Sequence, residues 1–518
     1  MRRRIASLIF FTCALTLASH TRAQIPENDP LHRAQASAAA CTTDASSSCA
    51  EVAAKILPVI LGPSPLQENL RRLTDEIGGR VTGSPALDRA VQWATSAFRA
   101  AAVDVHTEKY QLPLTWSEGD TRLELLGEIK FPLRTVSLGW SPASPHGGIA
   151  ANIVDIAYGT PQDFAAAATQ IKGAILLVHT DLGTTWADLF NEYSRPPEII
   201  ERAMKAGAAA ILWEGARERL LLYRHTNTTD GQLEKIPQAI LAREDALRLS
   251  RTVLAYPGKI RVRFSMPNSI GPPIDQQNVI AEIPGYEKPE ESVILGAHLD
   301  SWDLGTGALD NGCNAALVIE AARALKATGL RPRRTIRFIL FSGEEQGLLG
   351  SWAYVKTHRA ELDRIRAVII FDSGIGRVTG YSLGGRSDIA HAVREVLKPL
   401  DSWDVNRHTT DAQTGTDHFD FLLEGLPTLV ANQEEANYLP NYHAASDTLD
   451  KVDIRELKLN TTIAALTAWG LADRANPIGK RLSRAELETL MKETALDQQM
   501  KSMGYWQAWE KGARGRQP

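Results

Sequence analysis

The sequence has little cysteine, with four such residues among 518. Cys41 and Cys49 flank a stretch rich in threonine and serine, and in an oxidising compartment they could close a short loop. Cys313 stands in an apolar helical pattern, which predicts a buried thiol. Because none of the spacings matches a zinc–thiolate motif, thiol chemistry is excluded as the basis of function.

An excess of positive charge is also missing. The formal net charge is −4, although four arginines and no acidic residue fall within the first 23 residues. Removal of that stretch would leave a net charge of −8. A chain of this sign has no electrostatic attraction to nucleic acid or to anionic lipid, so neither is predicted as a partner.

Long apolar runs are missing beyond the amino terminus. Three arginines at residues 2–4 precede an apolar run over 5–18, and residues 21–23 resemble a cleavage site for export. This pattern predicts a signal peptide over 1–23 and a secreted or periplasmic protein with no membrane attachment after cleavage. A retained anchor is the alternative, but crossing a bilayer takes about 20 apolar residues.

Composition divides the rest of the chain into parts. Residues 24–50 are rich in small and polar residues, which predicts a flexible leader. Short strands and helices over 115–270 predict a small α/β module inserted into a larger domain, which residues 51–114 and 271–475 form together. Residues 476–518 are charged and favour helix, which predicts an accessory tail packed on the surface.

The carboxyl-terminal part of the larger domain alternates strands with helices. Short, almost continuously apolar runs predict strands, and longer apolar patterns predict helices between and after them. Strands of this kind are typical of a mainly parallel, mixed sheet that helices cover on both faces. The predicted strands are 293–296, 335–341, 367–371 and 428–431, and the predicted helices are 315–327 and 460–472.

Polar side chains that could carry chemistry follow three of these strands. His298 and Asp300 follow the first strand, Glu344 and Glu345 the second, and Asp372 the third. The ligand crevice of an open α/β sheet lies beyond the carboxyl ends of its strands. We therefore expect these side chains to gather at one edge of the sheet.

Two further candidates lie in loops, and the whole set predicts a metal centre. Asp310 precedes a predicted helix, and His443 lies in a polar loop near the end of the domain. Histidine and carboxylate ligands without thiolates suit Zn²⁺ or a similar divalent ion. Five ligands are more than a single catalytic ion needs. Two ions that share one bridging carboxylate would account for the surplus. The candidate ligands are His298, Asp310, Asp372, His443 and one of the pair Glu344 and Glu345.

Each candidate also has an ordinary structural interpretation when it is taken alone. Asp310 could be a helix N-cap, and paired glutamates usually lie in a solvated loop. A single histidine such as His443 more often has a structural hydrogen bond than a metal. Spacing does not say which of Glu344 and Glu345 would be a base, since adjacent residues on an extended chain point in opposite directions.

These motifs resemble those of a known family. The chain from about 65 to 475 is similar to the co-catalytic zinc exopeptidases related to aminopeptidase S and glutamate carboxypeptidase, in particular to the plasma glutamate carboxypeptidase type. Residues 172–178 and 206–212 of the insert resemble the protease-associated domain that several of these enzymes carry. The motifs that carry the family resemblance are 298–303, 307–311, 344–347, Asp372 and His443.

The resemblance implies two Zn²⁺ ions per chain and a role for each ligand. His298 and Asp372 would bind one ion, Glu345 and His443 the other, and Asp310 would bridge them. It implies Glu344 as the general base and a cis peptide bond between Asp310 and Asn311. Peptides are the substrates that the family predicts.

Further residues near these motifs are predicted to support the site. Asp300 and Asp447 would orient the imidazoles of His298 and His443. Catalytic assistance from His418 and substrate contacts from Asp417 and Tyr442 are also expected, although a structural loop is the alternative. Arg386 and Arg407 are conceivable anchors for a terminal carboxylate.

The predicted function is therefore a secreted dinuclear zinc exopeptidase that hydrolyses dipeptides or short peptides. The sequence leaves open whether it trims the amino or the carboxyl end, and whether it forms a homodimer. A single-zinc acyltransferase of the glutaminyl cyclase kind and a receptor-like relative without metals are the competing hypotheses. Metal content would separate the three.

Overall fold

The computed structural model describes residues 47–517. The predicted signal peptide, the residue Cys41 and the region 24–46 of the predicted leader lie outside the described residues. The prediction that the leader extends to residue 50 is wrong at its end, because helix α2 (Ser47–Leu61) begins earlier. Burial of Val52, Ile56 and Ile60 against the main core stabilises this helix.

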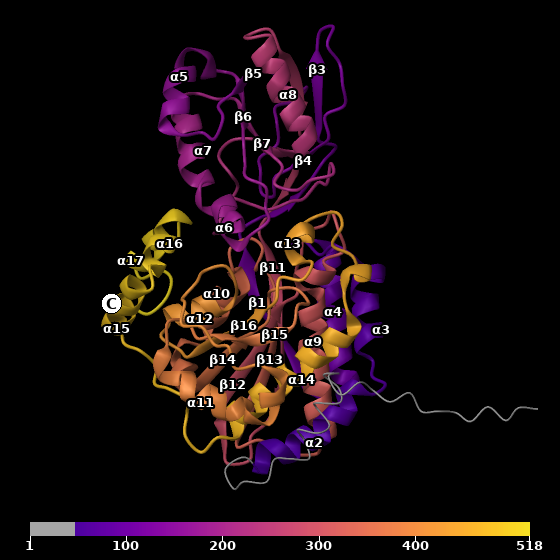
Figure 1. The fold of residues 1–518 in the computed structure, drawn as a ribbon, viewed down its shortest axis with the longest axis vertical. Helices are drawn as coiled ribbons and strands as arrows, with labels where there is room; N and C mark the ends of the chain where they lie inside the picture. Colours follow the sequence, from indigo (N-terminus) through magenta and orange to yellow (C-terminus); the bar gives the residue numbers. More distant parts are fainter. Residues whose placement is uncertain (1–46, 518) are drawn as a thin grey trace, which may run out of the picture.

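The larger part of the molecule is built on a seven-stranded mixed sheet (Figure 1). Its four central strands β13, β12, β14 and β16 pair in parallel, while the strands outside them join through antiparallel pairs. The prediction of a mainly parallel, mixed sheet is therefore confirmed. In spatial order the strands are β1 (Asp104–Leu112), β11 (Ile274–Ile283), β13 (Arg334–Phe341), β12 (Lys288–His298), β14 (Ile365–Ile370), β16 (Thr428–Gln433) and β15 (Val378–Ser382).

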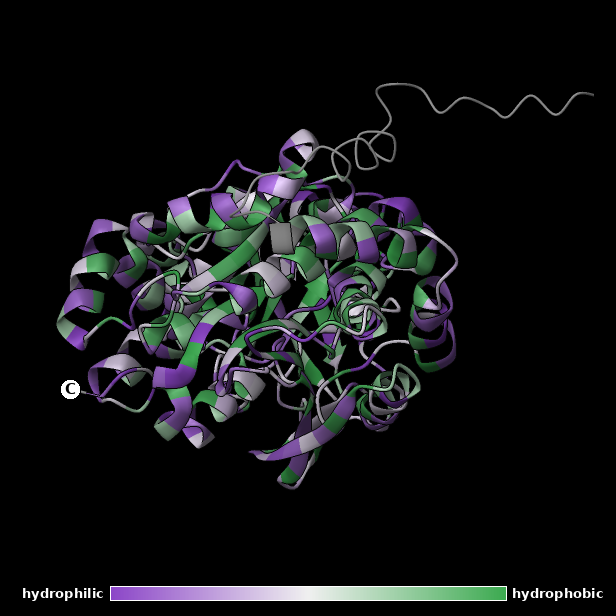
Figure 2. Cartoon of the chain, turned by 90° about the horizontal axis from the view of Figure 1, so that it is seen from below, coloured by the Kyte–Doolittle hydropathy of each residue, from purple (hydrophilic) through white to green (hydrophobic). Residues whose placement is uncertain are grey.

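Helices cover both faces of this sheet, so the α/β class predicted from the sequence is confirmed. Apolar strands lie in the middle, and the outward faces of the helices are polar (Figure 2). On one face lie α2, α3 (Leu66–Arg71), α4 (Pro85–Ala100), α9 (Cys313–Ala327), α11 (Ala390–Leu397) and α14 (Ile454–Asp473), and on the other lie α10 (Leu349–Thr357) and α12 (His418–Leu423). Cys313 is buried at the start of α9, as predicted.

A second seven-stranded sheet forms a smaller unit above the first, here called the small module (residues 122–265; Figure 1). The short strands β2 (Thr115–Ser117) and β10 (Ser269–Gly271) pair where the chain enters and leaves it. In spatial order its strands are β3 (Arg122–Leu126), β9 (Arg261–Ser265), β5 (Ile149–Asp155), β6 (Ile175–Val178), β7 (Ala210–Glu214), β8 (Gln238–Leu241) and β4 (Thr135–Ser137).

The helices of the small module cover its sheet and reach the larger part. Helices α5 (Pro161–Ile171) and α7 (Pro196–Lys205) pack on one face, and α8 (Arg243–Ala255) packs on the other. Helix α6 (Trp186–Ser194) lies between the two parts of the molecule (Figure 1). A capping box at Thr185 and Asp188 fixes where α6 begins.

The carboxyl-terminal segment is more firmly attached than a surface tail. Its helices α15 (Arg484–Glu493), α16 (Leu496–Ser502) and α17 (Trp506–Glu510) share an apolar cluster with Phe419 and Leu422 of α12. Arg514 is fully buried and pairs with Asp420 of α12 at 2.7 and 2.8 Å. It also donates to the carbonyl of Gly347, which ties the segment to the loop that follows β13.

Within residues 47–517, no helix is both long and apolar enough to cross a membrane.

Replacing Arg514 tests this attachment. Arg514→Met leaves the buried carboxylate of Asp420 without a partner, so we expect the free energy of unfolding to fall by about 3–5 kcal/mol. Urea unfolding followed by fluorescence of the nearby tryptophans measures the change. Lys511→Met, at an exposed position of the same segment, should change it by less than about 0.5 kcal/mol. Equal midpoints for the two variants would contradict the prediction.

Candidate metal centre

The predicted ligands come together at the carboxyl edge of the larger sheet. His298 is the last residue of β12, Glu344 and Glu345 follow β13, and Asp372 follows β14. These three strands are neighbours and run in parallel, so their ends deliver the side chains to one place. Asp310 lies in the segment Ala308–Gly312, and His443 follows helix α13 (Tyr438–Asn441).

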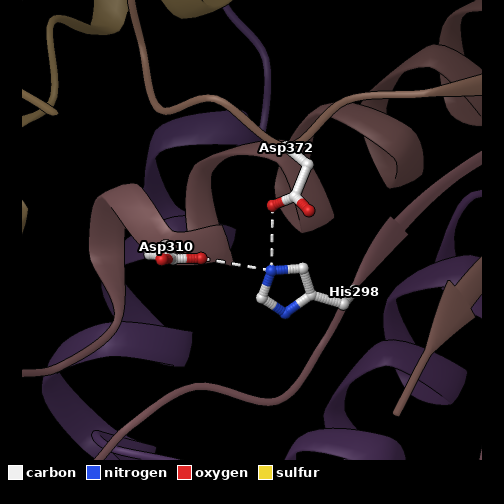
Figure 3. A group of neighbouring side chains, drawn as sticks. All are labelled: His298, Asp310 and Asp372. Atoms are coloured by element: carbon white, nitrogen blue, oxygen red, sulfur yellow. Dashed lines mark hydrogen bonds and ion pairs between the residues drawn. The ribbon is translucent and has the colours of Figure 1, made fainter. Parts of the chain in front are cut away.

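One group of ligands surrounds His298. Its Nε2 atom lies 2.9 Å from Asp372 Oδ1 and 3.1 Å from Asp310 Oδ1. Both carboxylates point toward the same ring nitrogen (Figure 3). The three ligand atoms lie within 4.8 Å of one another, which is the spacing that one bound cation requires.

A second group surrounds His443 and shares Asp310 with the first. His443 Nε2 lies 2.9 Å from Glu345 Oε2 and 3.1 Å from Asp310 Oδ2. Asp310 therefore presents one oxygen to each histidine. The three ligand atoms of this second group, one from each residue, also lie within 4.8 Å of one another. This is the arrangement of a carboxylate that bridges two cations.

The electrostatics of the cluster favour bound cations. Burial raises the pKa of Glu345 to about 7 and raises the pKa of Asp372. Oε1 of Glu345 is buried without a hydrogen-bond partner. Carboxylates packed this closely without compensating positive charge are costly to ionise. A divalent cation in each group would supply that charge, so the residues fit the metals that the sequence predicted.

The bridging aspartate is held from several sides. Bonds from His298 and His443 outweigh the effect of burial and hold the pKa of Asp310 below its usual range. Tyr438 donates a hydrogen bond to Asp310 Oδ2 at 3.0 Å. The peptide bond between Asp310 and Asn311 is cis, as predicted.

Asp300 supports the site differently from the prediction. His298 Nδ1 lies 3.0 Å from the main-chain carbonyl of Asp300, whereas the Asp300 carboxylate is 3.8 Å away. The carboxylate instead accepts hydrogen bonds from the amides of Glu344 and Glu345 and from Thr82. Asp300 therefore orients the imidazole through its backbone and the glutamate loop through its side chain.

Asp447 does not contact the ring of His443 as was predicted. Its carboxylate accepts hydrogen bonds from the amides of Ala308, Leu309 and Asp310 at 2.6–3.1 Å. The side chain of Asp447 therefore points toward the segment that contains Asp310. Its role is thus to position the bridging ligand.

The partner of His443 comes from the small module, which no sequence signal indicated. Tyr193 Oη lies 3.3 Å from His443 Nδ1 and 2.9 Å from Tyr442 Oη. The ring of Tyr442 stacks on His443 with centroids 3.7 Å apart. Tyr193 is the eighth residue of α6, and 250 residues separate it from His443. The small module therefore contributes directly to the metal centre.

A cleft of about 620 Å³ opens over the centre. Glu344 lines it together with Tyr442, which suits the predicted roles of base and substrate contact. Burial, reinforced by the charges of Asp372 and Glu345, raises the pKa of Glu344 well above its usual value. Helix α6 forms one wall, and Gln499 and Met503 of the carboxyl-terminal segment contribute to another.

The positions of Asp417 and His418 do not support contacts with substrate. Both are buried at the start of α12, and the cleft is lined instead by the residues before them, including Thr416. Burial lowers the pKa of His418 to about 4, so the ring is neutral. Burial raises the pKa of Asp417 well above its usual value, although the charge of His298 opposes this shift.

Neither arginine considered as a carboxylate anchor reaches the cleft. Arg386 is buried in an ion pair with Asp388, and Arg407 pairs with Asp404 on the surface. Each is committed to a neighbour on its own segment. This part of the sequence hypothesis is wrong, because residue type alone could not place the two side chains.

Comparisons with known proteins place these residues in context. A model of peptidase family M28 matches residues 278–468. Carboxypeptidase Q of Mus musculus is 31% identical over 410 residues, which cover 78% of this chain and 85% of the mouse protein. Aminopeptidase YwaD of Bacillus subtilis (strain 168) is 26% identical over 417 residues, which cover 75% of this chain and 80% of that protein.

A solved structure extends the similarity to the fold. The peptidase M28 precursor from Shewanella amazonensis SB2B superposes with a TM-score of 0.76 at 26% identity, covering 85% of this chain and 100% of that one. The mouse relative is named a carboxypeptidase and the Bacillus subtilis relative an aminopeptidase, so their names refer to opposite ends of a peptide.

Removing the hydroxyl of Tyr193 tests its link to the metal centre. Groups that hydrogen-bond a metal-binding histidine typically change metal affinity 10- to 100-fold, so Tyr193→Phe should weaken binding of one zinc ion by about 10-fold. Zinc titration against a competing chelator measures this. Tyr256→Phe, at an exposed tyrosine of the small module, is the control. Unchanged affinity in Tyr193→Phe would show that the contact has no role in metal binding.

Proposed function

The chain belongs to peptidase family M28, and from that premise we propose that it is a dinuclear zinc exopeptidase acting on dipeptides or short peptides. The observation that carries the proposal is the bridging position of Asp310, whose two oxygens face two separate ligand groups. A site for a single ion would not need a shared carboxylate. Two ions as close as this arrangement implies are typical of metal-assisted hydrolysis.

Each ligand has a definite role in this proposal. His298 and Asp372 would hold one ion, Glu345 and His443 the other, and Asp310 both. Zinc ions bound here would acidify an attacking water and polarise the carbonyl group of the scissile bond.

Glu344 is the residue that we propose as general base. It stands beside the ligand groups without belonging to either, and it lines the cleft. Its raised pKa suits a group that accepts a proton and later returns it to the departing amine. The hydrogen bond from the Glu344 amide to Asp300 fixes the loop from which it acts.

Two alternatives fit the geometry less well. A single-zinc acyltransferase of the glutaminyl cyclase kind would leave one ligand group without a purpose. A receptor-like relative that binds no metal would not need to keep a metal-binding side chain at all five ligand positions. In this chain each of the five positions has such a side chain. Both alternatives predict fewer zinc ions per chain.

The proposal extends to location and to the small module. The export pattern over residues 1–23 supports a secreted or periplasmic enzyme. We assign the small module as a protease-associated domain, and the contribution of α6 to the cleft supports a role in restricting substrates to short peptides.

Replacing the proposed base separates chemistry from metal binding. Glu344→Gln removes a proton acceptor and keeps the shape of the side chain, so kcat should fall by about 10²–10⁴-fold while two zinc ions remain bound. Dipeptide hydrolysis and elemental analysis measure the two quantities. Glu361→Gln changes an exposed glutamate outside the cleft, so this control should retain both the kcat and the two bound zinc ions. A fully active Glu344→Gln protein would refute the assignment.

Metal content tests the dinuclear centre itself. The zinc-loaded protein should contain about two zinc ions per chain, and prolonged chelation should abolish hydrolysis. Asp310→Asn should reduce the affinity for both ions, whereas Asp372→Asn should reduce it mainly for one. One ion per chain would favour the acyltransferase alternative, and none would favour the receptor-like one.

A further inference from the structure

The loop that carries His443 is held by the small module through its main chain. The Arg224 amide donates a hydrogen bond to the His443 carbonyl at 3.1 Å. The Ala445 amide donates in the other direction, to the Leu222 carbonyl at 2.9 Å. The two bonds form a short antiparallel bridge between the segments. The small module therefore fixes the backbone at and just after a proposed metal ligand.

The backbone of His443 needs this support because it is strained. Its φ angle is +58°, in the left-handed region that residues other than glycine rarely adopt. Such a conformation costs free energy and persists only where the surrounding structure holds it. Without the bridge to the small module the loop would relax, and the imidazole would leave its place beside Glu345 and Asp310.

The side chain of Arg224 anchors the bridge. It is buried, and its Nε atom lies 2.9 Å from Asp303 Oδ1 of the larger part. Its Nη1 donates to the Ser137 carbonyl of the small module at 3.2 Å, and its Nη2 pairs with Glu118, where the chain enters that module. The amide that binds His443 is therefore positioned by groups on both sides of the junction.

A tryptophan of the larger part is buried in the same junction. The ring of Trp302 lies 6.3 Å from that of Trp140 in the small module and 6.1 Å from that of His443. A side chain added at Gly139 would meet the Trp302 ring at 2.3 Å, so the backbone of the small module packs directly against it. Contacts thus run across the junction in both directions, and His443 lies between them.

The ligands of the other group depend on the larger part alone. His298 ends β12 and Asp372 follows β14, so the larger sheet places both. The Nδ1 atom of His298 lies 3.0 Å from the carbonyl of Asp300, which is also in the larger part. Within residues 47–517, no hydrogen bond or ion pair joins His298 or Asp372 to the small module. Loosening of the junction should therefore affect the two ligand groups unequally.

We propose that docking of the small module completes the zinc site around His443, and that Arg224 is the positioning residue for this link. The site around His298 would hold its ion without help from the module. Coupling of this kind is reciprocal, so the ion at His443 would in turn tighten the docking of the module. The inference rests on the proposed dinuclear centre.

Replacing Arg224 tests the link by metal affinity, without relying on turnover. Arg224→Met removes the charge and keeps an apolar side chain, so the amide that binds His443 loses its anchor. Zinc titration against a competing chelator should show one ion bound about 10-fold more weakly and little change for the other. Arg251→Met, at an exposed arginine of the small module, should leave both affinities unchanged. A merely structural role would lower stability and leave the ratio of the two affinities as it was.

A milder variant covers the case in which Arg224→Met does not fold. Asp303→Asn removes one charge beside Arg224 at a side chain that is 40% exposed. It should shift the ratio of the two zinc affinities in the same direction by a smaller factor. An unchanged ratio in this variant and in a folded Arg224→Met protein would overturn the inference.

Anomalous diffraction at limiting zinc shows which ion is affected. In Arg224→Met crystals the peak beside Glu345 and His443 should weaken, and the peak beside Asp372 should remain. Equal weakening of both peaks would contradict the inference. A wild-type protein that binds fewer than two zinc ions would instead refute the dinuclear centre on which the inference rests.

Hydrogen exchange measures the reciprocal effect in the wild-type protein. Because the coupling is the same in both directions, zinc loading should slow exchange of peptides that cover residues 222–226 by about 10-fold. Peptides that cover β6, in the core of the small module, are the control and should not change. Equal exchange of 222–226 with and without zinc would show that docking of the module and binding of the ion are independent.

Discussion

The shared position of Asp310 is the constraint on which the rest of the site depends. Its two oxygens lie 3.1 Å from the ring nitrogens of His298 and His443, so small movements of this residue would affect both groups. The surrounding chain limits such movement: Asp447 binds three successive amides around it, and Tyr438 binds its carboxylate. Preorganisation of this kind is what keeps closely spaced carboxylates ready for cations.

Three separate parts of the chain meet at the cleft. The larger sheet supplies the ligands, α6 of the small module supplies Tyr193 and an apolar wall, and the carboxyl-terminal segment supplies Gln499 and Met503. Arg514 connects that last segment to the loop after β13, which carries Glu344. The size of the cleft is therefore set by contacts distant in sequence, and the small module is part of the site.

The sequence was most informative about ligand residues that come directly after a buried strand. His298, Glu345 and Asp372 could be predicted because parallel strands place their carboxyl ends at one edge, and that rule needs no other coordinates. The residues that orient the ligands were harder. Asp447 was assigned to the histidine nearest in sequence but contacts a loop 137 to 139 residues away, and Tyr193 acts across 250 residues. The antiparallel edge strands β1, β11 and β15 were also missed, because none of them consists of the continuous apolar run on which the strand predictions relied.

Anomalous diffraction at the zinc edge from crystals of the zinc-loaded protein tests the central claim most directly. The account predicts two peaks about 3.5–4 Å apart, one on each side of the Asp310 carboxylate. A single peak, or two peaks that do not share this carboxylate, would contradict it.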